Sequence, residues 1–156
     1  MGDGEMIPVI GQQITSAVCR ALRAKYTNIP IYKEPIDQDF EEPCFFVWCS
    51  KTETSPVIWP KFRETHDIEV RYYPPERDRQ HGEGLDIGAE LVEVLSRIFI
   101  RDGDEESLPI WATDYSRRIV DDAVVVSLTY RTEGVIDQGE KAEAIGRVVF
   151  NIQPKE

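Results

Sequence analysis

The chain of 156 residues is long enough for one compact domain, but two independent hydrophobic cores would be hard to fit. Hydrophobic residues make up 41% and charged residues 30%, which is near the average of globular proteins and excludes a largely disordered chain. The net charge of -11 has the wrong sign for binding nucleic acid or anionic membrane over the general surface, although it leaves room for a local basic patch.

The N-terminal third reads as a helix followed by extended segments. Apolar residues recur every three or four positions from Ile10 to Leu22, which predicts a helix over about residues 8–26. Two prolines around Ile31 and Tyr32 then predict a short extended piece. The next stretch, FEEPCFFVWCS, is rich in aromatic residues and valine, which predicts a strand that ends near Ser50.

The middle of the chain predicts a hairpin and a second helix. Residues 51–63 contain two prolines and no steady period, so we expect a long loop there. Alternating apolar and polar residues predict a half-buried strand over about 64–73, stopped by Pro74 and Pro75. A second helix is predicted over about 84–100. Its apolar stripe consists of residues at helical spacing, namely Leu85, Ala89, Val92, Leu95 and Phe99, widened by Leu91, Val94 and Ile98.

Two strand-like runs follow, LPIWATDYSRRIV and DDAVVVSLTYRTEG, and they predict a second hairpin joined by Asp121 and Asp122. The expected fold is α+β, with a mostly antiparallel sheet of about four to five strands and two helices packed on one face. Residues 1–133 would form a single domain and 134–156 a C-terminal extension or arm. The run RVVFNI in this extension either completes its own sheet or adds to a neighbouring subunit.

The two cysteines in FEEPCFFVWCS raise the question of a metal or redox site. Cys44 and Cys49 are an odd number of positions apart, so on a strand they face opposite ways and neither pair with each other nor share a metal. Together with Cys19 they are predicted to be free thiols. The run is apolar on both faces, and its second face needs a cover, from a long loop, the C-terminal arm or the next subunit of an assembly.

The sequence contains no recognisable catalytic, phosphate-binding or metal-binding motif. The sequence has no phosphate-binding glycine loop, no GxSxG or HExxH motif, no paired CxxC and no zinc or calcium spacing, so we expect no enzyme, cofactor or metal. His66 lies next to Asp67, but strand neighbours point to opposite faces, which favours a structural histidine. No apolar run approaches the roughly 18 residues of a membrane span, and the N-terminus lacks the features of a signal peptide, so we expect a cytosolic protein that binds no membrane.

The most informative feature is a candidate contact surface. Val57, Ile58, Trp59 and Phe62 lie in a segment that cannot form a regular core strand, and they are flanked by Lys61 and Arg63. Aromatic and arginine residues supply much of the binding energy at protein interfaces. Trp59 therefore either belongs to a contact patch or folds back to cover the sheet. The candidate interface consists of residues from this segment and from the C-terminal run, namely Trp59, Lys61, Phe62, Arg63, Val148 and Phe150.

Residues 8–133 resemble the tail terminator proteins of Gram-positive phages and of related phage-tail-like particles. The resemblance rests on IPIY, an acidic stretch, EPCFFV and then the strand HDIEVRYYPP, in that order. It implies a ring, usually a hexamer, that caps the head-proximal end of the tail tube and stops tube polymerisation. It also implies docking of the head-side connector or the last sheath ring, and a location in the virion tail or neck after assembly in the host cytoplasm.

The same resemblance implies partners for the chain. These are other copies of itself, the tail tube protein, and sheath or connector proteins, with DNA only passing through the bore of the ring. Acidic side chains lining that bore would keep DNA from adhering. Two alternatives are another neck or head-tail adaptor protein, and a small cytosolic α+β ligand-binding domain or enzyme, which would need a concave pocket with converging polar groups.

Overall fold

The computed structural model describes residues 10–33, 41–75, 81–102, 105–137 and 147–150, and these form two helices and seven strands. The α+β prediction is confirmed. In chain order the elements are α1 (Ile10–Lys25), β1 (Ile31–Tyr32), β2 (Cys44–Pro56), β3 (Lys61–Tyr73), α2 (His81–Leu95), β4 (Arg97–Asp102), β5 (Glu105–Val120), β6 (Ala123–Asp137) and β7 (Arg147–Phe150). The sheet has more strands than the expected four or five, because β4 was predicted as helix and β7 was predicted only as one of two alternatives for the run RVVFNI.

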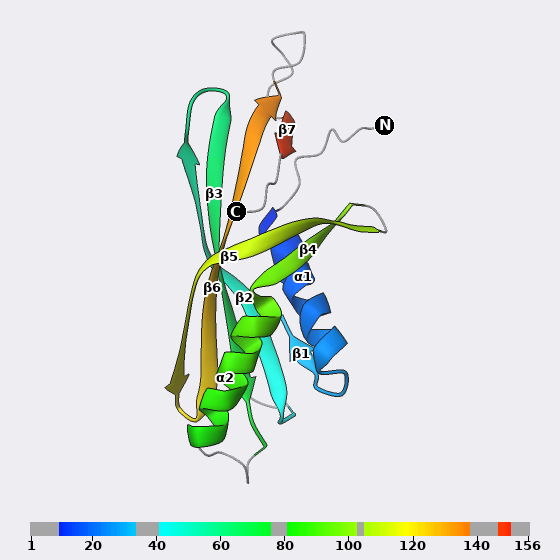
Figure 1. Ribbon diagram of the computed structural model, residues 1–156, viewed down its shortest axis with the longest axis vertical. Helices are drawn as coiled ribbons and strands as arrows, with labels where there is room; N and C mark the ends of the chain where they lie inside the picture. Colours follow the sequence, from blue (N-terminus) through cyan, green and yellow to red (C-terminus); the bar gives the residue numbers. More distant parts are fainter. Residues whose placement is uncertain (1–9, 34–40, 76–80, 103–104, 138–146, 151–156) are drawn as a thin grey trace.

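The strands form one curled sheet in the order β1-β2-β3-β6-β5-β4, with β7 paired to β6. The β1–β2 pair is parallel and the other pairs are antiparallel. The N-terminal half of β5 pairs with β4. Its C-terminal half, from Ala112 onward, pairs with β6, and this pairing ends at Tyr130 of β6. Further along β6, β7 pairs with Gly134–Asp137 on the side that β5 has left. The sheet therefore divides into a helix-covered body and a projecting part (Figure 1).

Both helices pack on one face of the body, as predicted. The core cluster combines one stripe of each helix with the strand residues that face it, namely Ile14, Val18 and Leu22 of α1, Leu91 and Leu95 of α2, and Phe45, Val47, Ile68, Val70, Val126 and Leu128 of the sheet. Ala89 was predicted in the apolar stripe of α2, and this is wrong. Ala89 is exposed, because the buried stripe of α2 runs through Gly88, Leu91 and Leu95.

Helix α2 ends earlier than predicted. It stops at Leu95, and residues 97–102 form β4 instead of the last helical turn. Ile98 and Ile100 are buried while Arg97 is exposed, which is the two-residue period of a strand. Phe99, expected on the helix, pairs with Pro109 of β5. The apolar residues of this run fit both periods, and the turn at Ser96 decides between them.

The first hairpin is longer than predicted, and the expected long loop over 51–63 is wrong. β2 continues to Pro56 and β3 begins at Lys61, so only the turn Val57–Pro60 separates the two strands. Their pairing runs unbroken to Pro56 and Phe62 apart from a bulge between Cys49 and Lys51. Residues 50–56 are exposed. A strand without a buried face carries no hydrophobic alternation, which is why the pattern indicated a loop.

The two faces of FEEPCFFVWCS are as expected. Phe45, Val47 and Cys49 pack in or against the core cluster. On the other face Phe46 lies edge-on between Tyr32 and Tyr73, with ring centroids 5.3 and 5.4 Å away. Aromatic residues of the same chain therefore help to cover the second apolar face of this strand. Within the described part of the C-terminal arm, β7 pairs with the far end of β6 and lies away from this run.

The second hairpin is confirmed, with Asp121 and Asp122 as its turn. Their φ angles of 52° and 66° place both in the left-handed region. Two successive left-handed residues give the turn whose twist matches that of paired strands. Aspartate tolerates this conformation better than most residues, which explains the pair of acidic residues at this position.

Candidate interaction surface

The β2–β3 hairpin and the end of β6 extend well beyond the helices (Figure 1). In this projecting part the sheet consists of β2, β3, β6 and β7, and its tip is the turn Val57–Pro60. The Val57 amide donates to the Lys61 carbonyl at 3.1 Å, and the Lys61 amide donates to the Ile58 carbonyl at 2.6 Å. The turn is thus closed by its own backbone, at the end of a continuous strand ladder.

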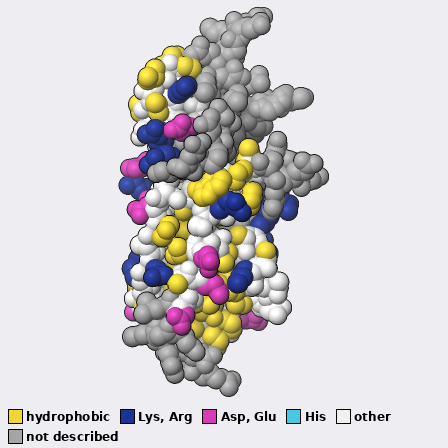
Figure 2. All heavy atoms as spheres, viewed as in Figure 1, with side chains coloured by type: hydrophobic (Ala, Val, Ile, Leu, Met, Phe, Trp, Pro, Cys, Tyr) yellow, Lys and Arg dark blue, Asp and Glu magenta, His cyan; other side chains and the backbone are white. Residues whose placement is uncertain are grey.

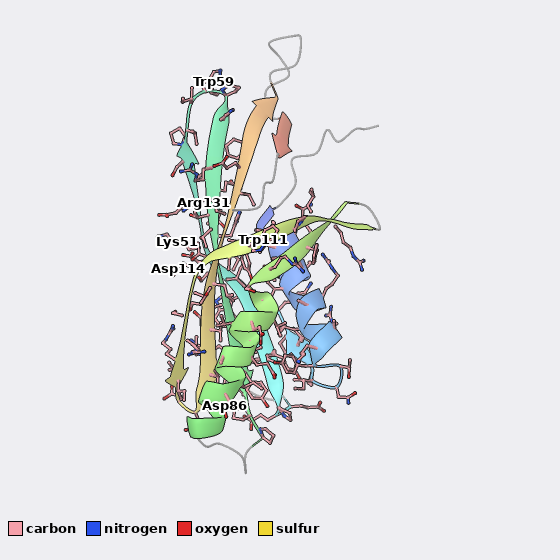
Figure 3. The ribbon with its side chains drawn as sticks, viewed as in Figure 1. Lys51, Trp59, Asp86, Trp111, Asp114 and Arg131 are labelled. Atoms are coloured by element: carbon pink, nitrogen blue, oxygen red, sulfur yellow. The ribbon has the colours of Figure 1, made fainter. Side chains whose placement is uncertain are left out.

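Apolar side chains are exposed at this tip. The exposed fractions are 43% for Val57, 74% for Ile58 and 68% for Trp59. Trp59 therefore does not fold back over the sheet, and that alternative is wrong. Figure 2 shows hydrophobic and basic side chains gathered at this end of the molecule, and Figure 3 places Trp59 at the tip. Exposed large apolar groups that occur together, and not singly, mark interaction sites.

The three predicted residues after the turn lie in different environments. Lys61 is exposed. Phe62 is half-buried and pairs with Pro56, in the β2–β3 residue pair next to the turn. The Arg63 guanidinium lies 3.1 Å from the Glu133 carboxylate of β6, with both side chains partly exposed. This ion pair neutralises Arg63, which leaves Lys61 as the cation next to the apolar tip.

The two C-terminal candidates, Val148 and Phe150, belong to β7. Gly134 of β6 pairs with Phe62 on one side and with Phe150 on the other, so the backbone of β7 lies at the same end of the sheet as the tip. The side chains of Val148 and Phe150 lie outside the described part of the chain. β7 pairs here with β6 of its own chain.

A buried histidine lies in the stem of the projecting part. His66 faces the same side as its cross-strand neighbours Thr52 and Tyr130 and is 1% exposed. Its Nδ1 lies 3.4 Å from Thr52 Oγ1, and its Nε2 lies 3.4 Å from Thr132 Oγ1 and 3.6 Å from Glu64 Oε1. Burial lowers the pKa of His66, against the opposing effect of Glu64 and Asp67. His66 is a structural residue here, as the sequence predicted.

The sheet face away from the helices carries many charged side chains besides the aromatic residues around Phe46. Among the residues whose side chains are described, the strand register assigns to it six basic and five acidic ones, namely Lys51, Lys61, Arg63, Arg71, Arg118 and Arg131 with Glu53, Asp67, Glu69, Asp114 and Glu133. Lys51 pairs with Glu53 at 3.1 Å and Arg71 with Glu69 at 2.8 Å. Figure 3 shows Lys51, Asp114 and Arg131 on this side. This face is nearly charge-balanced, whereas the whole chain carries a net charge of -11.

The sequence did not reveal one aromatic cluster. Arg97 of β4 lies over the rings of Phe99 and Trp111, at 5.2 and 5.8 Å from their centroids. An arginine within this distance of an aromatic ring makes a cation–π contact. The prediction of a helix through residue 100 hid this cluster, and the sequence carries no signal that could have found it, because the apolar residues of Arg97–Ile100 fit both periods.

The described residues contain no group of three or more histidine, cysteine or acidic side chains able to hold a metal ion. The described helices are each too short or too polar to cross a membrane.

All three cysteines are free, and burial raises the pKa of Cys44 to about 12 and that of Cys19 above its ordinary value. Cys19 and Cys44 are therefore poor thiolate nucleophiles, since the thiolate is the reactive form.

A family model described as "Phage tail terminator protein" matches residues 13–143. The match covers most of α1, all of α2, the strands from β1 to β6 and the whole projecting hairpin. It extends past residue 133, where the resemblance seen in the sequence ended. No curated protein matches the chain.

Proposed function

This chain belongs to the phage tail terminator family, and we propose that it closes the head-proximal end of a tail tube as a ring of identical subunits. Membership makes it a structural component of the phage tail that associates with the tail tube, and not an enzyme. The proposal adds the oligomer, which we infer is a hexamer, and the contact surfaces. It also assigns the ring two tasks, namely to end tube polymerisation and to offer a docking surface to the head connector or the last sheath ring.

The observation that carries the proposal is the apolar tip Val57–Trp59, held away from the helix-covered body by paired strands. A residue such as Trp59 at 68% exposure loses contact with water only if a partner covers it. The backbone hydrogen bonds of the turn hold the tip in place before binding, which reduces the entropy lost on association. We assign the tip, with Lys61, to the contact with the tube.

A ring requires that one patch on each subunit meets a different patch on the next. The projecting part and the body of this chain offer distinct surfaces of this kind. The sheet face away from the helices also concerns the passage of DNA. If that face lines the bore, DNA meets a nearly equal mixture of basic and acidic residues there and not the acidic lining that the net charge suggested.

The proposal is tested by mixing the purified protein with tail tubes and examining their ends by electron microscopy. We expect a ring on one end of each tube and arrest of further tube growth when tube subunits are added. Binding along the tube wall, or no binding with continued growth, would overturn it. Binding to a head-side connector but not to tube ends would identify the chain as an adaptor, which is the alternative role in the neck.

A further inference from the structure

The projecting part of the sheet has an open strand edge on each side. On one side β2 pairs with β1 only at Phe45 and Phe46, so within the described residues its outer edge is unpaired from Val47 to Pro56. On the other side, β7 pairs with β6, and no other described strand lies against it. Each open edge presents a row of backbone donors and acceptors able to pair with another strand.

The directions of these two edge strands are opposite. β2 is antiparallel to β3, β3 to β6, and β6 to β7. β7 therefore runs opposite to β2. If the β2 edge of one copy is placed beside the β7 edge of another, the new pair is antiparallel, as are all the pairs within the projecting part. The sheet would continue from one chain into the next without a change in its hydrogen-bonding pattern.

From these edges we infer that neighbouring subunits join by pairing β2 of one copy with β7 of the next. The inference rests on the proposed ring and specifies its subunit interface. The contact joins two different edges of the same chain, so it is heterologous and repeats until the rotation closes. Within one subunit, β2 and β7 overlap along the strand direction at a single row of paired residues, which consists of Pro56, Phe62, Gly134 and Phe150. Successive copies are then staggered along the strands, as closed sheets with tilted strands require.

The side chains of β2 suit a contact made through the backbone. Residues 50–56 are exposed and polar, and Lys51 pairs with Glu53 in its own strand. Charged side chains on an edge strand suppress random association of free subunits. They do not block a matched strand, because strand addition derives its affinity from main-chain hydrogen bonds. Pro56 has no amide hydrogen, so it marks the end of the usable edge.

A rival arrangement uses β2 alone. Two β2 strands paired about a two-fold axis at Thr52 would place Lys51 opposite Glu53 of the second copy, which is favourable. This contact is isologous, however, so it produces dimers and leaves both β7 edges open. The heterologous contact occupies both edges of every subunit in a ring. The two arrangements predict different cross-links.

The test uses single cysteine variants in a Cys49→Ser background, since Cys49 is the native cysteine that is not fully buried. One tagged set carries Lys51→Cys, Glu53→Cys or Ser55→Cys on β2, and a second, differently tagged set carries Val148→Cys or Val149→Cys on β7. The sets are mixed, assembled on tube ends and treated with a short bis-maleimide. We expect cross-links between the two tags, and ladders up to the full ring from chains that carry both substitutions.

The outcomes separate the interface from the function. Rings on tube ends without cross-links between the tags would overturn the inference and leave the proposed function intact. Cross-links only within the β2 set would establish the two-fold rival instead. Cross-links between the tags without rings on tubes would support the interface and contradict the capping function.

A proline scan tests the same contact through the backbone. Successive residues of a strand direct their amides to opposite edges, so of Glu53→Pro and Thr54→Pro one removes an amide from the open edge and the other from the ladder with β3. We expect the open-edge variant to keep its melting temperature but lose ring formation, while Glu53→Ala and Thr54→Ala keep both. Normal rings from a folded open-edge proline variant would overturn the inference.

Discussion

Tyr130 of β6 donates its hydroxyl hydrogen to the carbonyl oxygen of Leu95, the last residue of α2, at 2.7 Å. Both side chains are fully buried, and burial raises the pKa of Tyr130. The last carbonyls of a helix have no partner within the helix. This bond therefore satisfies a helix end inside the core, and it fixes the point at which the chain turns from α2 into β4.

We expect Tyr130→Phe to lower the free energy of unfolding by about 1–3 kcal/mol, the cost of leaving a buried carbonyl without a donor. The measurement is urea unfolding of the variant and the wild type. Tyr115→Phe is the matched control, since Tyr115 is 53% exposed. Equal stabilities for both variants would show that the Leu95 carbonyl finds another donor.

Gly88 lies where α2 packs closely against the sheet. A Cβ at this position would lie 3.3 Å from both Arg117 Cδ and Val124 Cγ1. The arginine side chain can move, but Val124 is buried and cannot. We expect Gly88→Leu to destabilise the fold by about 2 kcal/mol or more, because overpacking displaces the helix. Ala89→Leu, at the exposed neighbouring position, should change stability by less than about 0.5 kcal/mol in the same thermal or urea unfolding measurement.

The stability of the stem should depend on pH through His66. Burial holds its pKa in the folded state below the ordinary value of 6.5, so the unfolded chain binds the proton first as the pH falls. The contribution of neutral His66 is therefore complete above pH 6.5 and is lost as the pH decreases below it. Unfolding measured between about pH 8 and pH 5 should show a larger loss for the wild type than for His66→Gln. Identical pH profiles would contradict this assignment.

The tip prediction separates binding from folding. We expect the double variant Ile58→Ser and Trp59→Ser to reduce capping of tail tubes, while its stability changes by less than about 0.5 kcal/mol, because both side chains are exposed. Phe62 is left unchanged because it is half-buried, and its removal would also disturb the ladder. Tyr115→Ser is the control for loss of an exposed aromatic residue elsewhere. Normal capping and tail length with the double variant would exclude the tip as the tube contact.

The sequence predicted the elements whose burial pattern is regular. The stripe from Ile14 to Leu22 indicated α1, and the alternation around Ile68 and Val70 indicated β3, because each element buries a single face. It also indicated that Trp59, Lys61, Phe62 and Arg63 belong to one unusual segment. The prediction was wrong at Lys51–Pro56, where the strand has no buried face, and at Arg97–Ile100, where apolar residues suit a helix and a strand equally.

The sequence by itself determined the fold class, the two hairpins and the family, because the local hydrophobic periodicity and short sequence motifs carry that information. Only the tertiary structure decided that Trp59 projects into solvent at the end of a long ladder, since this depends on the pairing of β3 with β6 far along the chain. The ion pair between Arg63 and Glu133 and the junction of Tyr130 with Leu95 join distant segments in the same way. Contacts of this kind follow from how packed elements are placed in space, and no pattern within a single segment encodes them.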